Sequence, residues 1–306
     1  MREVFVKTLI EEARKNSNIY LITPDLGFSV LEDFESEFPD RFLNVGIAEA
    51  NAVNIAAGLA LSGKIVYIYS IIPFVTMRPF EQIRVNLAYM NTNVRLIGVG
   101  AGLTYGPLGA THHAIEDLSI MRALPNMTVC SPSDPWEVEN LTRESIAHSG
   151  PMYFRLAKKG EPVISNVTSQ FPSKGFNFIR HGKDLNILFT GNISDMALKV
   201  CTLLEDTYGK TVNLISVHTL KPFDHNAIDE IIRKGLPIFT IEEHSIVGGL
   251  GSIVSEYISE SGKGLIFKRI ALPDQYSHFV GSQENLRRRF GLIPEDIARD
   301  INERVQ

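Results

Sequence analysis

One carboxylate in this sequence, Glu49, occupies a position where a charge is unexpected. Between Arg41 and Lys64 it is the only charged residue, and the run around it consists mainly of Ala, Val, Ile, Leu and Gly. The spacing predicts a helix over 48–61, in which Glu49 shares its face with Ala52, Val53, Ala56 and Ala60. Burying a carboxylate on an apolar face costs free energy unless a partner satisfies it. Glu49 is therefore a candidate for chemistry that needs a placed acid.

A structural role for Glu49 is open as well. Gly46 as the helix N-cap would place Glu49 at the third helical position, where an acidic residue completes a capping box. A carboxylate there also interacts favourably with the positive end of the helix. Residue types and spacing alone do not decide between this capping role and a chemical one.

Three other motifs could carry chemistry, and each has a simpler structural interpretation that the spacing favours. The segment 98–102, GVGAG, follows a strand as dinucleotide-binding loops do, but Gly106-Pro107 follows where such a loop would open a helix, which favours a tight turn. The segment 248–251, GGLG, could present amides to an anion, although a helix start packed on a neighbour is favoured. The segment 111–117, THHAIED, has metal-binding residue types without a second ligand cluster, which favours a polar loop and no metal site.

Short apolar runs rich in β-branched residues alternate with helical patterns, which predicts an α/β fold of two domains, each a mainly parallel sheet with helices on both faces. A helix is expected over 135–147, where Asp134 and Pro135 supply an N-cap and a first-turn proline. The expected strands are 19–23, 65–69, 94–99, 128–131, 152–155, 186–190, 212–216, 237–241 and 266–270. The polar stretch 161–183 interrupts this alternation, and we interpret it as a linker between a domain over 1–160 and a second over 184–306.

Composition narrows the classes of protein to which the chain can belong. It has 306 residues, 44% of them hydrophobic, and a net charge of -5, which argues against a nucleic-acid-binding surface. The longest apolar run, IVYIYSIIPFV, is shorter than the roughly 20 residues of a membrane-spanning helix, and the N-terminal segment lacks the apolar core of a signal peptide. With only two cysteines, Cys130 and Cys201, a reducing cytoplasmic location is expected.

Four segments, taken in order, resemble successive motifs of the transketolase family. They are NVGIAEANAVNIAAGLALSGK, YIYSIIPFVTMRPFEQIR, GATHHAIEDLSIMRALPNMTVCSPSD and TIEEHSIVGGLG, and the resemblance extends over about residues 19–300. It implies the C-terminal half of a transketolase, with a pyrimidine-binding domain over 1–160 and a transketolase C-terminal domain over 184–306. The cofactor that it implies is thiamine diphosphate, bound together with Mg²⁺.

The resemblance also implies roles for individual residues. Glu49 matches the catalytic glutamate that hydrogen-bonds a pyrimidine nitrogen of the cofactor and stabilises its imino tautomer. Phe74 matches the aromatic residue that stacks on the pyrimidine, although a core phenylalanine is the simpler interpretation. Ser70 and Ile71 would contact the cofactor at a strand end, and Ile71 stands where the family has an aromatic residue. His112 matches a catalytic histidine of the substrate pocket.

Several expected substrate contacts depart from the family pattern. Leu108 stands where transketolases have an acid that contacts a sugar hydroxyl. Gly100 stands where they have a phosphate-binding histidine, a change that we expect to leave space. Arg155 and Lys158 lie near the position of an arginine that binds a substrate phosphate, and a solvated charge cluster is the simpler interpretation of that pair. These departures imply an acceptor unlike ribose 5-phosphate.

A diphosphate site is missing from this chain. The family holds the diphosphate and Mg²⁺ through a Gly-Asp-Gly motif, and this sequence contains none. The resemblance therefore implies a separately encoded N-terminal-half subunit, an α2β2 heterotetramer, and transfer of a two-carbon ketol unit from a ketose donor to an aldehyde sugar. Two alternatives are open. One is a decarboxylating enzyme, either the β subunit of an oxo-acid dehydrogenase or a deoxyxylulose-phosphate-synthase-like enzyme, and the other is a non-catalytic scaffold subunit.

Overall fold

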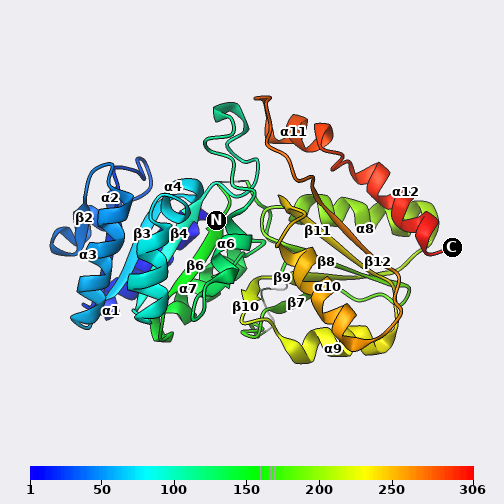
Figure 1. The fold of residues 1–306 in the computed structure, drawn as a ribbon, viewed down its shortest axis with the longest axis horizontal. Coiled ribbons are helices and arrows are strands. Elements are labelled where there is room, and N and C mark those ends of the chain that lie inside the picture. Colours follow the sequence, from blue (N-terminus) through cyan, green and yellow to red (C-terminus); the bar gives the residue numbers. More distant parts are fainter. Residues whose placement is uncertain (159, 166, 168–169) are drawn as a thin grey trace.

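Two helix-covered sheets lie side by side in the computed structural model, which describes residues 1–306 apart from 159, 166, 168 and 169 (Figure 1). The first sheet is built mainly from the N-terminal half of the chain and the second from the C-terminal half. This arrangement confirms the expected α/β fold.

Seven strands form the first sheet in the order β10-β5-β6-β4-β3-β1-β2. All neighbours are parallel except β10, which runs antiparallel to β5. Parallel strands need packed layers on both faces, and β4 is accordingly buried at every residue. The strands are β1 Ile19–Thr23, β2 Phe42–Asn44, β3 Ile65–Ile71, β4 Val94–Val99, β5 Thr128–Cys130, β6 Met152–Leu156 and β10 Thr219–Lys221.

Five strands form the second sheet in the order β12-β11-β8-β9-β7. They are parallel except for β7, which pairs antiparallel with β9. The strands are β7 Phe176–Arg180, β8 Leu185–Thr190, β9 Val212–Val217, β11 Ile238–Ser245 and β12 Phe267–Leu272.

Helices cover both faces of the first sheet. On one face α1 and α7 pack against each other and bury Phe5 and Leu9 completely, and α3 packs on the other face (Figure 1). Each such side chain contributes about 1.5–3 kcal/mol through its burial. The helices are α1 Arg2–Lys15, α2 Glu32–Glu37, α3 Glu49–Leu61, α4 Ile72–Thr76, α5 Phe80–Gln82, a π-helical segment Ile83–Tyr89, α6 Asp117–Ala123 and α7 Pro135–Ala147, with 3₁₀ turns at Pro39–Arg41 and Gly106–Leu108.

The second sheet carries five helices among the described residues. They are α8 Ser194–Tyr208, α9 His225–Lys234, α10 Leu250–Ser261, α11 Gln283–Arg289 and α12 Pro294–Arg304. In the part of the chain that the structure describes, we find no helix with the length and apolar character needed to cross a membrane.

The start of helix α7 is set by local contacts that the sequence predicts. It begins at Pro135, as predicted, because the Asp134 side chain accepts a 2.8 Å hydrogen bond from the main-chain N–H of Glu137. The Glu137 carboxylate in turn accepts a hydrogen bond of 2.7 Å from the N–H of Ser133. The predicted helix over 135–147 is confirmed.

All nine predicted strands are present, some with shifted ends, but the sequence does not predict β2, β7 and β10. These three lie at sheet edges, where a strand is paired on one side only and needs no continuous apolar run. Strand β7 lies at 176–180, inside the segment 161–183, so the expectation of a linker is wrong for those residues. Strand β10 belongs by sequence to the second domain but extends the first sheet, and it therefore ties the two domains together.

Candidate active site

Glu49 is the first residue of α3, beside the end of the first sheet. Its side chain is only 5% exposed, and its Oε1 accepts a 2.8 Å hydrogen bond from Nη1 of Arg78. The N-cap of α3 is Ala48, and no side chain caps this helix end. The capping-box interpretation is therefore wrong, because Glu49 is at the first helical position and Gly46, with a φ of 70°, lies before the helix.

Arg78 is a functional candidate that the sequence did not reveal. Its guanidinium lies over the Phe74 ring, 4.0 Å from the ring centroid, while it pairs with Glu49. The Arg78 side chain is 48% exposed, so the ion pair lies at the protein surface although its carboxylate is buried. The spacing of four residues from Phe74 is typical of a helical contact, but nothing in the sequence links Arg78 to Glu49.

His112 lies edge-to-face against Phe74, with the ring centroids 5.1 Å apart. Burial, assisted by the positive charge of Arg78, lowers the pKa of His112 below its ordinary value, so the ring is neutral at pH 7. Its Nδ1 forms a 2.9 Å hydrogen bond with Oγ1 of Thr111. A neutral imidazole can donate from one nitrogen and accept at the other, as proton transfer to a substrate oxygen requires.

Tyr105 occupies the space beside Gly100. Gly100 has a φ of 95°, and a Cβ added there would lie 2.1 Å from the Tyr105 ring. The expectation that Gly100 leaves space is therefore wrong. Tyr105 also faces His112, at a centroid distance of 6.2 Å, and Nζ of Lys158 lies 5.0 Å from its ring centroid. Tyr105 thus connects His112 with Lys158, and no sequence motif marks it.

Ser70 and Ile71 end β3 directly before α4. Ile71 is half-buried, whereas the Ser70 hydroxyl is fully buried and finds no hydrogen-bond partner within the described ranges. An unsatisfied buried hydroxyl costs free energy, but because Ser70 is 0% exposed a ligand atom would reach it only after neighbouring side chains move. Leu108, by contrast, is 53% exposed at the end of a 3₁₀ turn.

These residues fit the pyrimidine ring that the family resemblance implies. A flat heterocycle needs an aromatic face and an acid at its edge, and Phe74 and Glu49 are groups of these two kinds, although Arg78 lies over the Phe74 ring and against Glu49 in this structure. Outside the four undescribed positions, no group of three or more His, Cys, Asp or Glu side chains is placed to hold a metal ion.

The Arg155 side chain is buried in the protein and does not face solvent. It is 1% exposed, and its Nε donates a 2.9 Å hydrogen bond to Oδ2 of Asp117. Its Nη2 donates to two main-chain carbonyl oxygens at 2.9 and 3.0 Å. The interpretation as a solvated cluster is therefore wrong for Arg155, whose donors are engaged internally. Lys158 is partly exposed and is the member of the pair that lies next to Tyr105.

The weaker motifs have the structural roles that their spacing favoured. The segment 98–102 forms a turn after β4, and residues 111–116 form a loop that leads into α6. At 248–251 the chain enters α10, whose amides at Leu250 and Gly251 each donate a 2.8 Å hydrogen bond to the Glu242 carboxylate. A side chain of the protein itself therefore takes the place of an anion at this helix start.

Two family models match the chain over most of its length. The transketolase pyrimidine-binding domain matches residues 1–161, and the transketolase C-terminal domain matches residues 175–297. The chain belongs to the transketolase family. Membership of this family implies dependence on thiamine diphosphate.

Subunits of transketolases are among its relatives. The chain is 33% identical to one of the subunits of apulose-4-phosphate transketolase from Actinobacillus succinogenes, over 97% of this chain and 96% of the relative. It is 34% identical to the 6-deoxy-6-sulfo-D-fructose transketolase subunit SqwH from a Clostridium species, over 99% and 94%. A solved structure, described as the inactive β4 tetramer of a split-gene transketolase, matches with a TM-score of 0.90 and 33% identity, over 99% and 97%. The chain is therefore a transketolase-like transferase subunit, and its likeness to such subunits implies a separate N-terminal partner.

Proposed function

We propose that this chain supplies the pyrimidine-binding half of a thiamine-diphosphate-dependent active site that transfers a two-carbon ketol unit from a ketose donor to an aldehyde sugar. A separately encoded N-terminal-half subunit would hold the diphosphate and Mg²⁺, and two copies of each chain would form an α2β2 heterotetramer. The observation that carries this proposal is the contact series from buried Glu49 through Arg78 and Phe74 to His112.

Glu49 is the proposed catalytic acid at the pyrimidine edge. Its burial limits competition from water for the carboxylate, and Phe74 lies on the other side of Arg78, whose guanidinium covers a face of the Phe74 ring and would have to move for a pyrimidine to stack there. When bound, thiamine diphosphate supplies the nucleophilic carbon of the reaction. Glu49 would hold a proton at the pyrimidine nitrogen, while Phe74 orients the ring by stacking. Arg78 would have to leave Oε1 of Glu49 or share the carboxylate with the cofactor.

His112 is the proposed proton-transfer residue on the substrate side. Because burial lowers the pKa of His112, the neutral ring can act as donor or acceptor at pH 7. The hydrogen bond between Nδ1 and Thr111 leaves Nε2 for a substrate oxygen. Ser70 and Ile71 are proposed to contact the cofactor, the Ser70 hydroxyl being without another partner in the described structure.

The acceptor is proposed to be a sugar that is deoxygenated or otherwise modified near its aldehyde, rather than ribose 5-phosphate. A hydroxyl beside Leu108 would lose water without gaining a partner, at a cost of about 1–3 kcal/mol. The Tyr105 ring fills the space beside Gly100. The absence of a side chain at Gly100 therefore makes room for Tyr105 and does not enlarge the pocket. Lys158, next to Tyr105, offers a positive charge to an anionic group of the substrate.

The named relatives support a substrate outside the ordinary pentose phosphates. One is named for apulose 4-phosphate and the other for 6-deoxy-6-sulfo-D-fructose. The two relatives are almost equally similar to this chain, at 33% and 34% identity. The overall sequence identity therefore does not indicate which of these two kinds of substrate this chain would use. The pocket residues Leu108, Tyr105 and Lys158 are the better guide.

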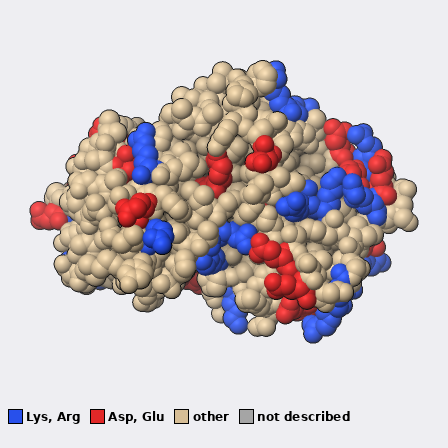
Figure 2. Space-filling model, in the orientation of Figure 1, with Lys and Arg blue, Asp and Glu red and all other residues tan. Residues whose placement is uncertain are grey.

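The surface of the first domain supports the proposal of a partner subunit. On the face shown in Figure 2, charged side chains gather over the second domain and are sparse over the first. Two apolar residues of the first domain, Phe28 and Ile47, are 75% and 77% exposed, and Ile47 is two positions from Glu49. Ile47, exposed beside Glu49, lies where a second chain that covers the site would bury it.

The two alternatives have less support. The transketolase subunits are covered to 96% and 94% of their own length, whereas 1-deoxy-D-xylulose-5-phosphate synthases of 33–36% identity are covered to only 46–48%, which favours ketol transfer over a decarboxylating reaction. A scaffold subunit would gain nothing from a buried acid at Glu49. For the location we propose the cytoplasm, because Cys130 and Cys201 are buried and form no disulfide.

Calorimetric titration of thiamine diphosphate and Mg²⁺ into this chain, into the partner and into their mixture tests the division of the site. We expect binding only when the partner is present, because the charged diphosphate has no site here. Two-carbon transfer is then measured with one ketose donor against ribose 5-phosphate and against deoxy or sulfonated aldehydes. Tight Mg²⁺-dependent binding to this chain alone would contradict the split site. Ribose 5-phosphate as the best acceptor by kcat/KM would contradict the acceptor proposal.

A further inference from the structure

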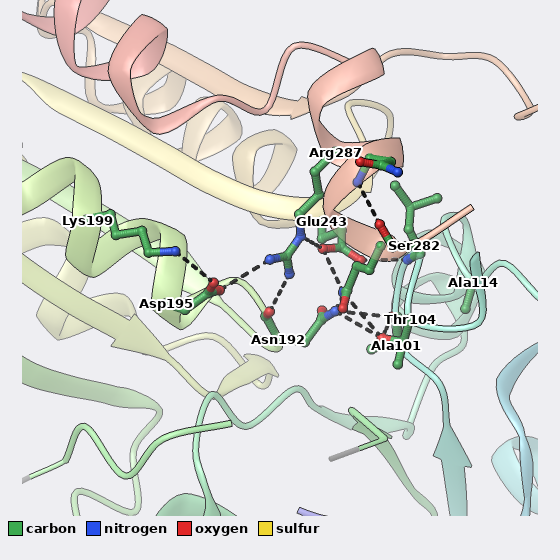
Figure 3. Close-up of polar contacts among 12 residues, drawn as sticks. Ala101, Thr104, Ala114, Asn192, Asp195, Lys199, Glu243, Ser282 and Arg287 are labelled. Carbon is green, nitrogen blue, oxygen red and sulfur yellow. Dashed lines mark hydrogen bonds and ion pairs between the residues drawn. The ribbon is translucent and has the colours of Figure 1, made fainter. Parts of the chain in front are cut away.

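The segment 101–112, which carries Tyr105 and His112, is held by side chains of the second domain (Figure 3). Glu243 in β11 is fully buried, and its Oε1 accepts a 2.6 Å hydrogen bond from the main-chain N–H of Leu103. A hydrogen bond to a carboxylate in a water-free setting is charge-assisted and strong. The second domain therefore fixes the chain only two residues from Tyr105.

Two further side chains of the second domain hold the same segment. Asn192, between β8 and α8, donates from Nδ2 to the Ala101 carbonyl oxygen and to Glu243 Oε1, both at 3.1 Å. Gln283, the first residue of α11, donates from Nε2 to Glu243 Oε1 at 2.8 Å and to Thr104 Oγ1 at 3.4 Å. Asn192 and Gln283 therefore each contact both the segment and Glu243, which is the centre of the cluster.

Two glycines allow the segment to approach the second domain this closely. A Cβ added to Gly102 would lie 2.3 Å from Glu243 Oε1, and Gly102 also has a left-handed φ of 59°. A Cβ added to Gly106 would lie 2.4 Å from the carbonyl oxygen of Gly281, whose N–H donates to Gly106 at 3.3 Å. The first half of the segment, residues 101–106, is thus closely fitted to the second domain.

Arg287 in α11 balances the charge of Glu243. Its Nε pairs with Glu243 Oε2, and its Nη2 donates a 2.8 Å hydrogen bond to the carbonyl oxygen of Asn192 (Figure 3). Its Nη1 lies 3.3 Å from Oδ1 of Asp195. A buried carboxylate that lost these donors would be left unpaired at a high cost, so the cluster tolerates few other arrangements. The position of the segment is restricted accordingly.

Glu242, the preceding residue of β11, has different hydrogen-bond partners. Both carboxylates are buried, but Glu242 binds the first amides of α10 and makes no hydrogen bond to the segment 101–112 among the described residues. Successive side chains of a strand point to opposite faces, which explains the division. Glu242 therefore offers a matched control for Glu243.

We propose that Glu243 is a positioning residue of the active site: it fixes the segment that carries Tyr105 and His112, and the second domain thereby shapes the acceptor side of the pocket. The consequence for catalysis rests on the proposed transketolase function, whereas the positioning is a property of this chain alone. Glu49 and Phe74 do not contact the cluster in the described structure, so cofactor binding should be independent of it.

The test compares Glu243→Gln with Glu242→Gln. A glutamine at 243 can still accept from Leu103, but its amide faces the donors of Arg287, and the cluster must rearrange. In the full chain we expect hydrogen–deuterium exchange over 100–112 to accelerate about tenfold or more in Glu243→Gln, with no change there in Glu242→Gln. In the enzyme assembled with its partner, the KM for the acceptor should rise about tenfold in Glu243→Gln while the affinity for thiamine diphosphate is unchanged.

Two results would overturn the proposal. Unchanged exchange over 100–112 in Glu243→Gln overturns it, and so does an equal acceleration in both variants, which would indicate a general loss of stability. If Glu243→Gln does not fold, Glu243→Asp keeps a negative charge beside Arg287 but shortens the reach to the N–H of Leu103, and its exchange over the same segment gives the decision. If even the unaltered enzyme transfers no ketol unit, the proposed function fails, and the exchange measurement still decides whether Glu243 positions the segment.

Discussion

Replacing Glu49 by Gln tests whether this carboxylate is an acid of the reaction or only the ion-pair partner of Arg78. Glutamine has the same shape and can accept the Arg78 hydrogen bond, but it cannot exchange a proton with the pyrimidine ring. We expect turnover to fall by about two or more orders of magnitude, the scale of a placed proton-transfer group. The fold should change little, because an ion pair whose Arg78 side is 48% exposed contributes at most about 1 kcal/mol.

Arg78→Gln separates the two roles, because it breaks the same ion pair and keeps the carboxylate. Its melting temperature should shift by about as much as that of Glu49→Gln, whereas hydrogen–deuterium exchange at the thiazolium carbon should persist only in Arg78→Gln. The assay follows this exchange by NMR in the assembled enzyme at saturating cofactor, with thermal unfolding measured in parallel. Normal exchange in Glu49→Gln, or an equal loss in both variants, would refute the reasoning.

Phe74→Ala is expected to weaken thiamine diphosphate binding by roughly 0.5–1.5 kcal/mol beyond the lost contact area, as measured by calorimetry, and undiminished affinity would return Phe74 to a core role. Leu108→Asp should raise kcat/KM for ribose 5-phosphate about tenfold, since a substrate hydroxyl regains a partner, and an unaltered acceptor preference would contradict the place given to Leu108. Acidification should lower the melting temperature as the pH falls from 6.5 toward about 4. Burial lowers the pKa of His218 from 6.5 to about 4. In this pH range the unfolded chain therefore binds a proton that the folded chain does not bind, which favours unfolding. His218→Gln should weaken that dependence, and a curve identical to that of the unaltered chain would show that His218 is not its source.

Local patterns predict nine of the twelve strands in the described part of the chain and the unusual acid, and miss the edge strands β2, β7 and β10. The runs at 19–23 and 94–99 are strands because consecutive apolar residues require cover on both faces, and this requirement is visible within a few residues. Helix 135–147 begins as predicted because an N-cap interaction joins residues three apart. Glu49 can also be recognised from local sequence, because it is the single charged residue within an apolar run.

Contacts between distant segments could not be predicted in this way. Arg78 reaches Glu49 across 29 positions because it lies in the turn between α4 and α5, and α5 and the π-helical segment after it pack on α3. Arg155 looked like a surface charge, yet Asp117, 38 positions away, draws it into the interior. The placement of Tyr105 beside Gly100 depends on a left-handed turn that the residue types allow but do not require.

Only the tertiary structure decided how the second domain takes part in the site. Glu243 and Leu103 are 140 positions apart, and their hydrogen bond exists because the two sheets pack side by side (Figure 1). Neither residue type nor spacing distinguishes Glu243 from Glu242, but the alternation of side chains along β11 directs one to the segment 101–112 and the other to α10. A sequence pattern reports periodicity and burial, whereas the identity of the buried groups that meet depends on how whole domains pack.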